Sequence, residues 1–283
     1  MMRFDIFSKK FNTLTILLKP HKINTYIGVL FLLISAPAYA QDTLIYKSEY
    51  LSKPDTVLIF KPQNFSPAKS LPLVYLLHGY GGNYNQWNSI IDAQKQADKY
   101  GFILVCPDAN LNSWYINSPV KSKSQFQNFF FSELYPDILK KYHPNQKQIF
   151  ISGLSMGGQG ALNLFIQKPE LFLSAGSSSG VMDLKKSSDK YGLTSLIGPS
   201  TEAGLWDDFS VLKLVEKLKG SEKPFIFDCG TLDPFHRGNV DLMEKCATLN
   251  LAATFISQPG KHDRQYWKKS IEKHFDFFTA LIK

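Results

Sequence analysis

The serine at position 155 has the clearest catalytic context in this sequence, because it lies in the segment GLSMG at residues 153–157. A serine hydroxyl is a weak nucleophile until a base removes its proton, and the G-x-S-x-G spacing is typical of a serine held on a sharp turn from a strand into a helix. The apolar run at residues 148–152 predicts that strand, and residues 158–168 predict the helix. We therefore predict Ser155 as a nucleophile, with a plain helix-capping serine as the alternative.

A nucleophilic serine needs a histidine to take its proton and an acid to orient that histidine. Downstream of Ser155 the chain has His236, His262 and His274. His262 follows the last predicted strand in a loop, where a base would hang over the carboxyl edge of a sheet. His274 lies within the final predicted helix and is expected to be a surface or packing residue. His262 is therefore the predicted base.

The acid should lie between the serine and the histidine in the chain. Asp233 meets this requirement in the loop after a predicted strand at residues 225–229. Asp228 falls inside that strand, and Asp241 opens a helix, where it would favour the helix dipole. Asp263 adjoins the predicted base and would struggle to reach its ring. Asp233 is the predicted acid.

Acyl transfer places negative charge on a carbonyl oxygen, and two backbone N–H groups normally hold that charge. One should come from Met156, directly after the nucleophile. The other should come from the segment HGYGG at residues 78–82, which follows a predicted strand at residues 73–77 and resembles an HGGG-type loop. Tyr80 is the predicted donor there, and His78 is expected to shape the loop by hydrogen bonding.

The elements that must position these residues alternate between strands and helices. Residues 43–50 and 56–61 show the alternation of half-exposed strands and predict a leading hairpin. Nearly continuous apolar runs predict strands buried on both faces of a parallel sheet at residues 73–77, 102–106, 148–152 and 225–229, and a last strand at 253–258. Helical patterns fall at residues 89–100, 125–142, 158–168, 211–218, 240–249 and 266–282. The sequence thus predicts an α/β-hydrolase fold with a mostly parallel central sheet and helices on both faces.

Two segments interrupt this rhythm. Pro136 should kink the helix predicted at residues 125–142, because proline has no N–H to donate within a helix. Residues 180–205 show no regular pattern. We interpret them as an insertion near the site.

The first 40 residues look like a signal peptide. Lys19 and Lys22 precede the apolar run at residues 26–34, and AYA at residues 38–40 fits a cleavage site. The run is too short to span a bilayer comfortably, which favours cleavage over a retained anchor. We expect one α/β-hydrolase domain at residues 41–283, without stable membrane insertion, that is exported to the periplasm or secreted.

Composition and charge exclude several other classes of protein. Hydrophobic residues make up 44% of the chain and charged residues 20%, which is ordinary globular usage. The net charge of +8 includes +4 from residues 1–40, which hold five Lys or Arg and one Asp, and the other positive residues are scattered, so no nucleic-acid partner is expected. Cys106, Cys229 and Cys246 are too few for a disulfide framework and are expected to be buried. We expect no metal site and no cofactor.

Four segments together resemble the esterase D family of α/β hydrolases. They are LLHGYGG at residues 76–82, GLSMGG at 153–158, DCGTLDPF at 228–235 and GKH at 260–262. The resemblance spans residues 43–283 and implies a catalytic triad and two oxyanion donors, at Ser155, Asp233 and His262 and at Tyr80 and Met156. Many members have glycine and tryptophan where this chain has Lys261 and Arg264, a departure at the rim of the expected pocket.

The resemblance implies acyl transfer but leaves the substrate open, because the family includes S-formylglutathione hydrolases, short-chain, feruloyl and acetylxylan esterases, and mycolyltransferases. Export favours hydrolysis of carboxylic esters, such as acetyl or feruloyl groups on polysaccharide, over the cytosolic thioester S-formylglutathione. Acyl transfer to an alcohol and a non-catalytic binding module are further alternatives. Aromatic side chains expected to stack on sugars or a phenolic acyl group, or else to pack internally, are Trp87, Trp114, Tyr115 and Trp206.

Overall fold

A computed structural model describes residues 41–202 and 204–282 of the chain. The expected signal peptide at residues 1–40 lies outside the described residues. Within 41–202 and 204–282, no helix has the length and apolar character needed to cross a bilayer.

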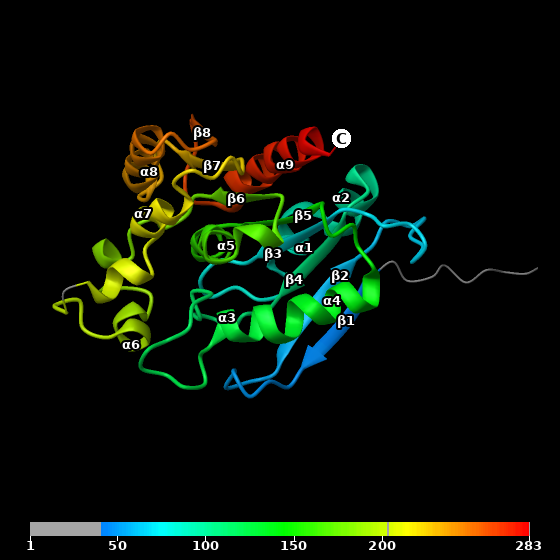
Figure 1. The fold of residues 1–283 in the computed structure, drawn as a ribbon, viewed down its shortest axis with the longest axis horizontal. Helices are drawn as coiled ribbons and strands as arrows, with labels where there is room; N and C mark the ends of the chain where they lie inside the picture. The colour runs from blue at the N-terminus through cyan, green and yellow to red at the C-terminus, as the bar shows by residue number, and fades with distance from the viewer. Residues whose placement is uncertain (1–40, 203, 283) are drawn as a thin grey trace, which may run out of the picture. The chain divides into compact units, whose positions relative to one another are not determined.

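Eight strands of the described chain form one sheet in the order β1-β2-β4-β3-β5-β6-β7-β8 (Figure 1). β1 (Gln41–Tyr46) pairs antiparallel with β2 (Asp55–Phe60), which confirms the predicted hairpin, and β2 pairs antiparallel with β4 (Ile103–Pro107). From β4 onward, each strand of the sheet pairs in parallel with the next. These strands are β3 (Leu73–Leu77), β5 (Ile149–Gly153), β6 (Ser174–Ser178), β7 (Phe225–Gly230) and β8 (Ala253–Gln258). The predicted α/β-hydrolase sheet is confirmed.

β6 is the strand that the sequence does not predict, because its residues SAGSS contain no apolar run. Its small side chains have a structural reason. A Cβ atom on Gly176 would lie 2.6 Å from Nδ1 of His274, and one on Gly158 would lie 2.6 Å from Oγ of Ser177. Helices therefore approach β6 too closely on both faces for larger residues.

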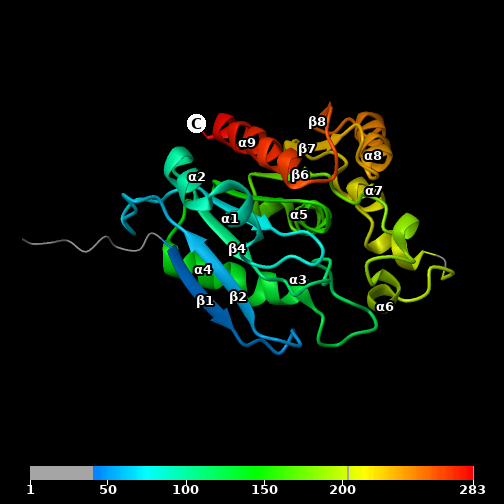
Figure 2. The ribbon, with the colours of Figure 1, turned by 180° about the vertical axis from the view of Figure 1, so that it is seen from behind.

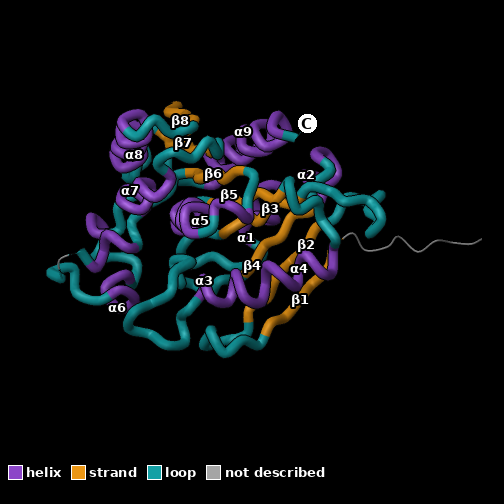
Figure 3. Tube along the Cα trace, viewed as in Figure 1, coloured by secondary structure: helices purple, strands orange, loops and turns teal. Residues whose placement is uncertain are grey.

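Helices cover both faces of the sheet, as Figures 1 and 2 show from opposite sides and Figure 3 shows with strands in orange and helices in purple. Along β3, Leu73, Tyr75 and Leu77 pack into one core cluster, and Val74 and Leu76 pack into the other. The first cluster includes residues of α3 (Phe126–Phe129), α4 (Tyr135–Tyr142), α5 (Met156–Gln167), α7 (Val211–Leu214) and α8 (His236–Thr248). The second includes residues of α1 (Gln86–Ile91), α2 (Ala93–Tyr100) and α9 (Arg264–Leu281).

The interruption expected at Pro136 is a π-helical turn at Phe130–Leu134 that joins α3 to α4. The inserted segment contains α6 (Leu193–Ile197) between 3-10 turns at Lys185–Ser187 and Leu205–Asp208. Two further 3-10 turns follow α5 and α7, at Pro169–Leu171 and Val215–Leu218. The three cysteines are buried, as expected, and all three are free.

Candidate active site

Ser155 lies on the turn between β5 and α5, with φ 53° and ψ −116°. A positive φ is strained for a residue with a Cβ atom, and such strain clusters at functional sites. The backbone N–H of Ser155 donates to the carbonyl oxygen of Ser178 at 2.9 Å, which ties the turn to β6. The turn therefore presents the hydroxyl at the carboxyl end of the sheet from a fixed position.

The glycines of the GLSMG segment are required by close backbone approach. A Cβ atom on Gly157 would lie 2.2 Å from the carbonyl oxygen of Leu77 in β3. A Cβ atom on Gly153 would lie 2.2 Å from the carbonyl oxygen of Gly157. Any side chain at either position would push the turn away from the sheet.

A chain of hydrogen bonds runs from Ser155 through His262 to Asp233. Nε2 of His262 lies 2.9 Å from Oγ of Ser155, and Nδ1 lies 2.8 Å from Oδ2 of Asp233. The Asp233 carboxylate is fully buried, and its Oδ1 accepts the N–H of Phe235 at 2.9 Å. When Nδ1–H donates to Asp233, the lone pair on Nε2 is free to accept the serine proton.

The loops that carry the acid and the base are bonded to each other. The N–H of Leu232 donates to Gly260 at 2.9 Å, and the N–H of Thr231 donates to Gln258 at 2.9 Å. The backbones approach so closely that a Cβ atom on Gly230 would lie 2.4 Å from the carbonyl oxygen of Gly260. This contact fixes Asp233 relative to His262.

Aromatic rings fix the plane of the His262 imidazole. Phe235 and Trp267 both meet it edge to face, with ring centroids 5.1 and 5.0 Å away. The side chain of His262 remains 25% exposed, so a substrate can still reach it.

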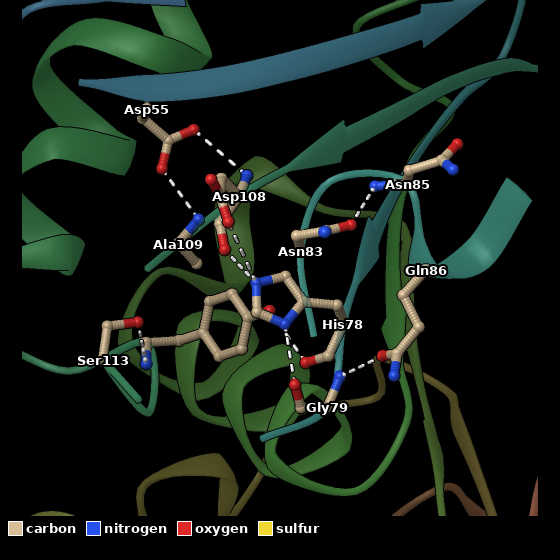
Figure 4. A network of polar contacts seen from close by, with 10 residues as sticks. Asp55, His78, Gly79, Asn83, Asn85, Gln86, Asp108, Ala109 and Ser113 are labelled. Carbon is tan, nitrogen blue, oxygen red and sulfur yellow. Dashed lines mark hydrogen bonds and ion pairs between the residues drawn. The ribbon is translucent and has the colours of Figure 1, made fainter. Parts of the chain in front are cut away.

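Hydrogen bonds occupy three N–H groups of the 78–82 loop, and Figure 4 shows the one from Gly79 to Gln86. The N–H of Gly79 donates to Oε1 of Gln86 at 2.7 Å, that of Gly81 to Leu111 at 2.9 Å, and that of Gly82 back to Gly79 at 3.0 Å. Among the described residues, the N–H of Tyr80 has no acceptor, and neither has that of Met156. Two predicted oxyanion donors are thus available to a ligand.

His78 shapes this loop. Its Nδ1 lies 2.8 Å from the carbonyl oxygen of Gly79, and its Nε2 contacts the carbonyl oxygen of Asp108. Burial lowers the pKa of His78 to about 4. A neutral imidazole has one N–H, so His78 donates to one of these two carbonyl oxygens and holds the loop through that bond.

Ser155 and His262 line a cavity of about 210 Å³. Five aromatic side chains also line it: Tyr80, Trp114, Tyr191, Phe235 and Trp267. The cavity can therefore take a small or flat apolar group beside the serine hydroxyl.

Tyr191, which sequence reasoning missed, joins three loops around this cavity. It comes from the inserted segment, and its ring centroid lies 5.4 Å from that of Tyr80, 6.3 Å from Trp114 and 6.4 Å from Phe235. Its carbonyl oxygen accepts the indole N–H of Trp114 at 3.2 Å. The sequence feature that points toward Tyr191 is the irregular pattern of residues 180–205, which we interpret as an insertion near the site.

Of the four aromatic residues expected to contact substrate, Trp114 alone lines the cavity. Trp87, Tyr115 and Trp206 are each at most 1% exposed and pack in the core. The indole N–H of Trp87 donates to Leu77 at 2.9 Å, and the hydroxyl of Tyr115 donates to His78 at 2.9 Å. For these three residues, the packing alternative is the one that the structure supports.

The rival acids have other partners. Asp228 pairs with His274 inside the protein, Asp241 pairs with Arg237 on α8 at 2.6 Å, and Asp263 caps α9. Within the described chain, no group of three His, Cys, Asp or Glu side chains is arranged to hold a metal ion.

Lys261 and Arg264, the departures from the family pattern, do not line the cavity. Lys261 is exposed, and Arg264 donates to the carbonyl oxygen of Ser89 at 2.6 Å. The neighbouring Trp267 does line the cavity. The two departures therefore lie outside the cavity lining.

Comparisons with known proteins identify the family of this chain. Residues 48–278 match the model of a family described as "Putative esterase". The chain is 25% identical over 259 residues to an acetyl esterase of Caldicellulosiruptor saccharolyticus, covering 83% of this chain and 97% of that protein. It is 22% identical over 265 residues to an S-formylglutathione hydrolase of Arabidopsis thaliana, covering 83% and 91%. A solved ferulic acid esterase shares the fold, with a TM-score of 0.73, 23% identity, and coverage of 86% and 98%.

Proposed function

The chain belongs to this esterase family and is a serine esterase, and from that premise we propose that it hydrolyses carboxylic esters through an acyl-enzyme on Ser155. The observation that carries the proposal is the hydrogen-bond chain from Ser155 through His262 to Asp233, in which Ser155 and His262 line the cavity. A nucleophile, a base and an orienting acid within hydrogen-bond reach are what acyl transfer by serine requires.

In the first half-reaction, Oγ of Ser155 attacks the carbonyl carbon of the ester while Nε2 of His262 takes the hydroxyl proton. Asp233 stabilises the resulting imidazolium through the Nδ1–H bond of 2.8 Å. When the tetrahedral intermediate collapses, His262 passes the proton to the departing alcohol. The products of this step are the free alcohol and the acyl-serine.

In the second half-reaction, water attacks the acyl-serine. His262 takes a proton from the water and returns it to Oγ of Ser155, which releases the carboxylic acid and restores the enzyme. In both tetrahedral intermediates the negative oxygen would be held by the N–H groups of Tyr80 and Met156. Their lack of acceptors among the described residues supports this role.

The substrate class that we propose is an acetyl or feruloyl ester of polysaccharide. The aromatic lining of the cavity supports a short or planar acyl group, and the alcohol would lie toward solvent. The likeness to an acetyl esterase supports the acetyl alternative. The S-formylglutathione hydrolase relative keeps a thioester as the second candidate substrate.

We also propose that residues 1–40 are a cleaved signal peptide and that residues 41–283 form the exported domain. The basic and apolar patterning of residues 19–40 supports this proposal. Amino-terminal sequencing of the protein recovered from outside the cytoplasm should begin at Gln41. Recovery of the intact chain in the cytoplasm would contradict export.

The decisive variant for the reaction is Ser155→Ala, which should abolish cleavage of p-nitrophenyl acetate. The matched control is Ser174→Ala in β6, because the buried hydroxyl of Ser174 has no hydrogen-bond partner in the described chain. Full activity in Ser155→Ala would overturn the mechanism. Assaying the wild type on acetylxylan, methyl ferulate and S-formylglutathione would then rank the substrates, and turnover of the thioester alone would contradict the polysaccharide ester.

A further inference from the structure

Asp55 is a buried carboxylate far from any catalytic motif in the sequence. It is the first residue of β2 and is 0% exposed, and no basic side chain of the described chain is paired with it. Burial raises its pKa to about 7. A buried carboxyl group without a basic partner lowers the stability of the fold, and such groups are often found at functional sites.

Both oxygens of Asp55 accept backbone N–H groups from one segment (Figure 4). Oδ2 accepts the N–H of Ala109 at 2.7 Å, and Oδ1 accepts the N–H of Asp108 at 3.2 Å. The carboxylate therefore anchors the start of residues 108–115, which we call the strut segment.

The backbone of the strut segment is strained. Four of its residues have positive φ although none is glycine, and they are Ala109 (52°), Asn110 (50°), Trp114 (50°) and Tyr115 (58°). Residues in this region persist only when their surroundings hold them there. The bonds to Asp55 supply such support at the amino-terminal end of the segment.

The strut segment in turn holds the 78–82 loop at three points. The carbonyl oxygen of Asp108 contacts Nε2 of His78, and that of Leu111 accepts the N–H of Gly81 at 2.9 Å. The hydroxyl of Tyr115 donates to the carbonyl oxygen of His78 at 2.9 Å. These contacts flank Tyr80, whose N–H has no acceptor among the described residues.

We propose that Asp55 is a positioning residue for the oxyanion hole. Its carboxylate fixes the strut segment, the strut segment fixes the 78–82 loop, and the loop aims the N–H of Tyr80 at the developing negative charge. This inference rests on the esterase mechanism proposed above. Asp55 does not line the cavity, so it acts through other residues and touches no substrate.

The test is Asp55→Asn, which keeps the size of the side chain but directs an amide NH2 toward one of the two backbone donors. We expect kcat on p-nitrophenyl acetate to fall about 10-fold with KM changed less than about 2-fold, because an oxyanion donor acts in the transition state and loss of a whole donor costs about 100- to 1,000-fold. Circular dichroism and thermal unfolding would establish that the variant is folded.

The matched control is Asp42→Asn on the same hairpin. Asp42 bonds Lys61 at 2.7 Å and Tyr142 at 2.9 Å, well away from the strut segment. The Asp42→Asn variant should leave kcat unchanged. An Asp55→Asn variant that loses stability but keeps kcat when folded would overturn the positioning role, as would equal kcat losses in both variants.

The pH profile supplies a readout that a purely structural role would not move. The ionisable groups facing Asp55 are Asp108, Tyr46 and Tyr115. Only the ionised carboxylate accepts both N–H groups well, so wild-type kcat should include an ionisation near pH 7 that Asp55→Asn lacks. An identical acid limb in both proteins would overturn the inference. Failure of the proposed function would be seen separately, as retained cleavage of p-nitrophenyl acetate by Ser155→Ala.

Discussion

Nε2 of His274 lies 2.7 Å from Oδ2 of Asp228, and both side chains are fully buried between the sheet and α9. Nδ1 of the same histidine lies 2.8 Å from Oγ of Ser152 in β5, and Oγ of Ser270 donates to Asp228 at 2.6 Å. The network joins β5, β7 and α9. It consists of an acid, a histidine and a serine, but it has no access to solvent and no place for a substrate.

Replacing His274 by alanine should destabilise the protein, because the buried Asp228 side chain would lose its bond to Nε2 of His274. Loss of one hydrogen-bond partner of a buried polar group typically lowers the free energy of unfolding by about 1–3 kcal/mol. Urea denaturation measures this. His236→Ala, which removes an exposed bond to Ser257, should cost less than about 1 kcal/mol. Similar losses in the two variants would show that the buried network contributes little.

Gln86→Leu should lower kcat, because Oε1 of Gln86 holds the N–H of Gly79 next to the predicted oxyanion donor Tyr80. We expect about a 10-fold loss with KM nearly unchanged, since misplacing a donor costs less than removing it. Steady-state kinetics on p-nitrophenyl acetate measure both constants. Gln94→Leu on α2, where the amide bonds Lys61 at 2.8 Å, is the control. Unchanged kcat in Gln86→Leu would mean that the loop holds its shape without this bond.

Tyr191→Ala should alter acyl selection, because this ring contacts Tyr80, Trp114 and Phe235 around the cavity. Aromatic contacts contribute about 0.5–1.5 kcal/mol each, so kcat/KM for methyl ferulate should fall about 10-fold relative to p-nitrophenyl acetate. Tyr191→Phe keeps the ring and should behave as wild type. A parallel fall for both esters in Tyr191→Ala would argue against a role in selection.

The stability of the wild type should depend on pH through Asp55. Its pKa in the folded protein is about 7, against 3.8 for an ordinary carboxyl group, so the folded state binds more protons between these values. Protonation of Asp55 therefore adds to the free energy of unfolding. This stabilisation is fully present below pH 3.8 and is lost as the pH rises through 7. Asp55→Asn should flatten the fall in unfolding free energy over this range, as measured by urea denaturation at several pH values. Parallel curves for the two proteins would contradict the raised pKa.

Gly157→Ala should prevent productive folding of the turn, because the added Cβ would lie 2.2 Å from one backbone oxygen and 2.5 Å from another. Neither oxygen can move without displacing β3. In Gly238→Ala on α8, the added Cβ would lie 4.0 Å from its nearest atom. This variant should stabilise the protein by about 0.5–1 kcal/mol, because alanine has a higher helix propensity than glycine. Soluble yield and thermal unfolding midpoints compare the two. A well-folded, active Gly157→Ala would refute the close-approach argument.

The sequence predicts the sheet and the order of the site residues because both depend on local patterns. Apolar runs mark the buried strands, and the loops after them carry Asp233 and His262. The structure brings His262 within hydrogen-bond distance of both Asp233 and Ser155. β6 escapes prediction because close packing on both faces requires small residues, which leave no apolar run.

The supporting residues of the site cannot be read from local patterns. Asp55 bonds a residue 54 positions away, and Trp114 bonds Tyr191 across 77 positions. Residue type alone also does not separate aromatic side chains that line the cavity from those that pack in the core. Trp114 lines the cavity, whereas its neighbour Tyr115 packs in the core. Such roles depend on which loops meet in three dimensions.

The three cysteines make the folded and unfolded chain respond differently to oxidants. Cys106, Cys229 and Cys246 are buried and unbridged, and burial raises the pKa of all three, that of Cys246 to about 12. Thiolates react and thiols hardly do, so the native protein should tolerate aerobic handling without reductant. Unfolding exposes an odd number of thiols, and at least one must then remain unpaired or bridge to another molecule. Recovery from denaturant should therefore require a reducing agent, although storage does not.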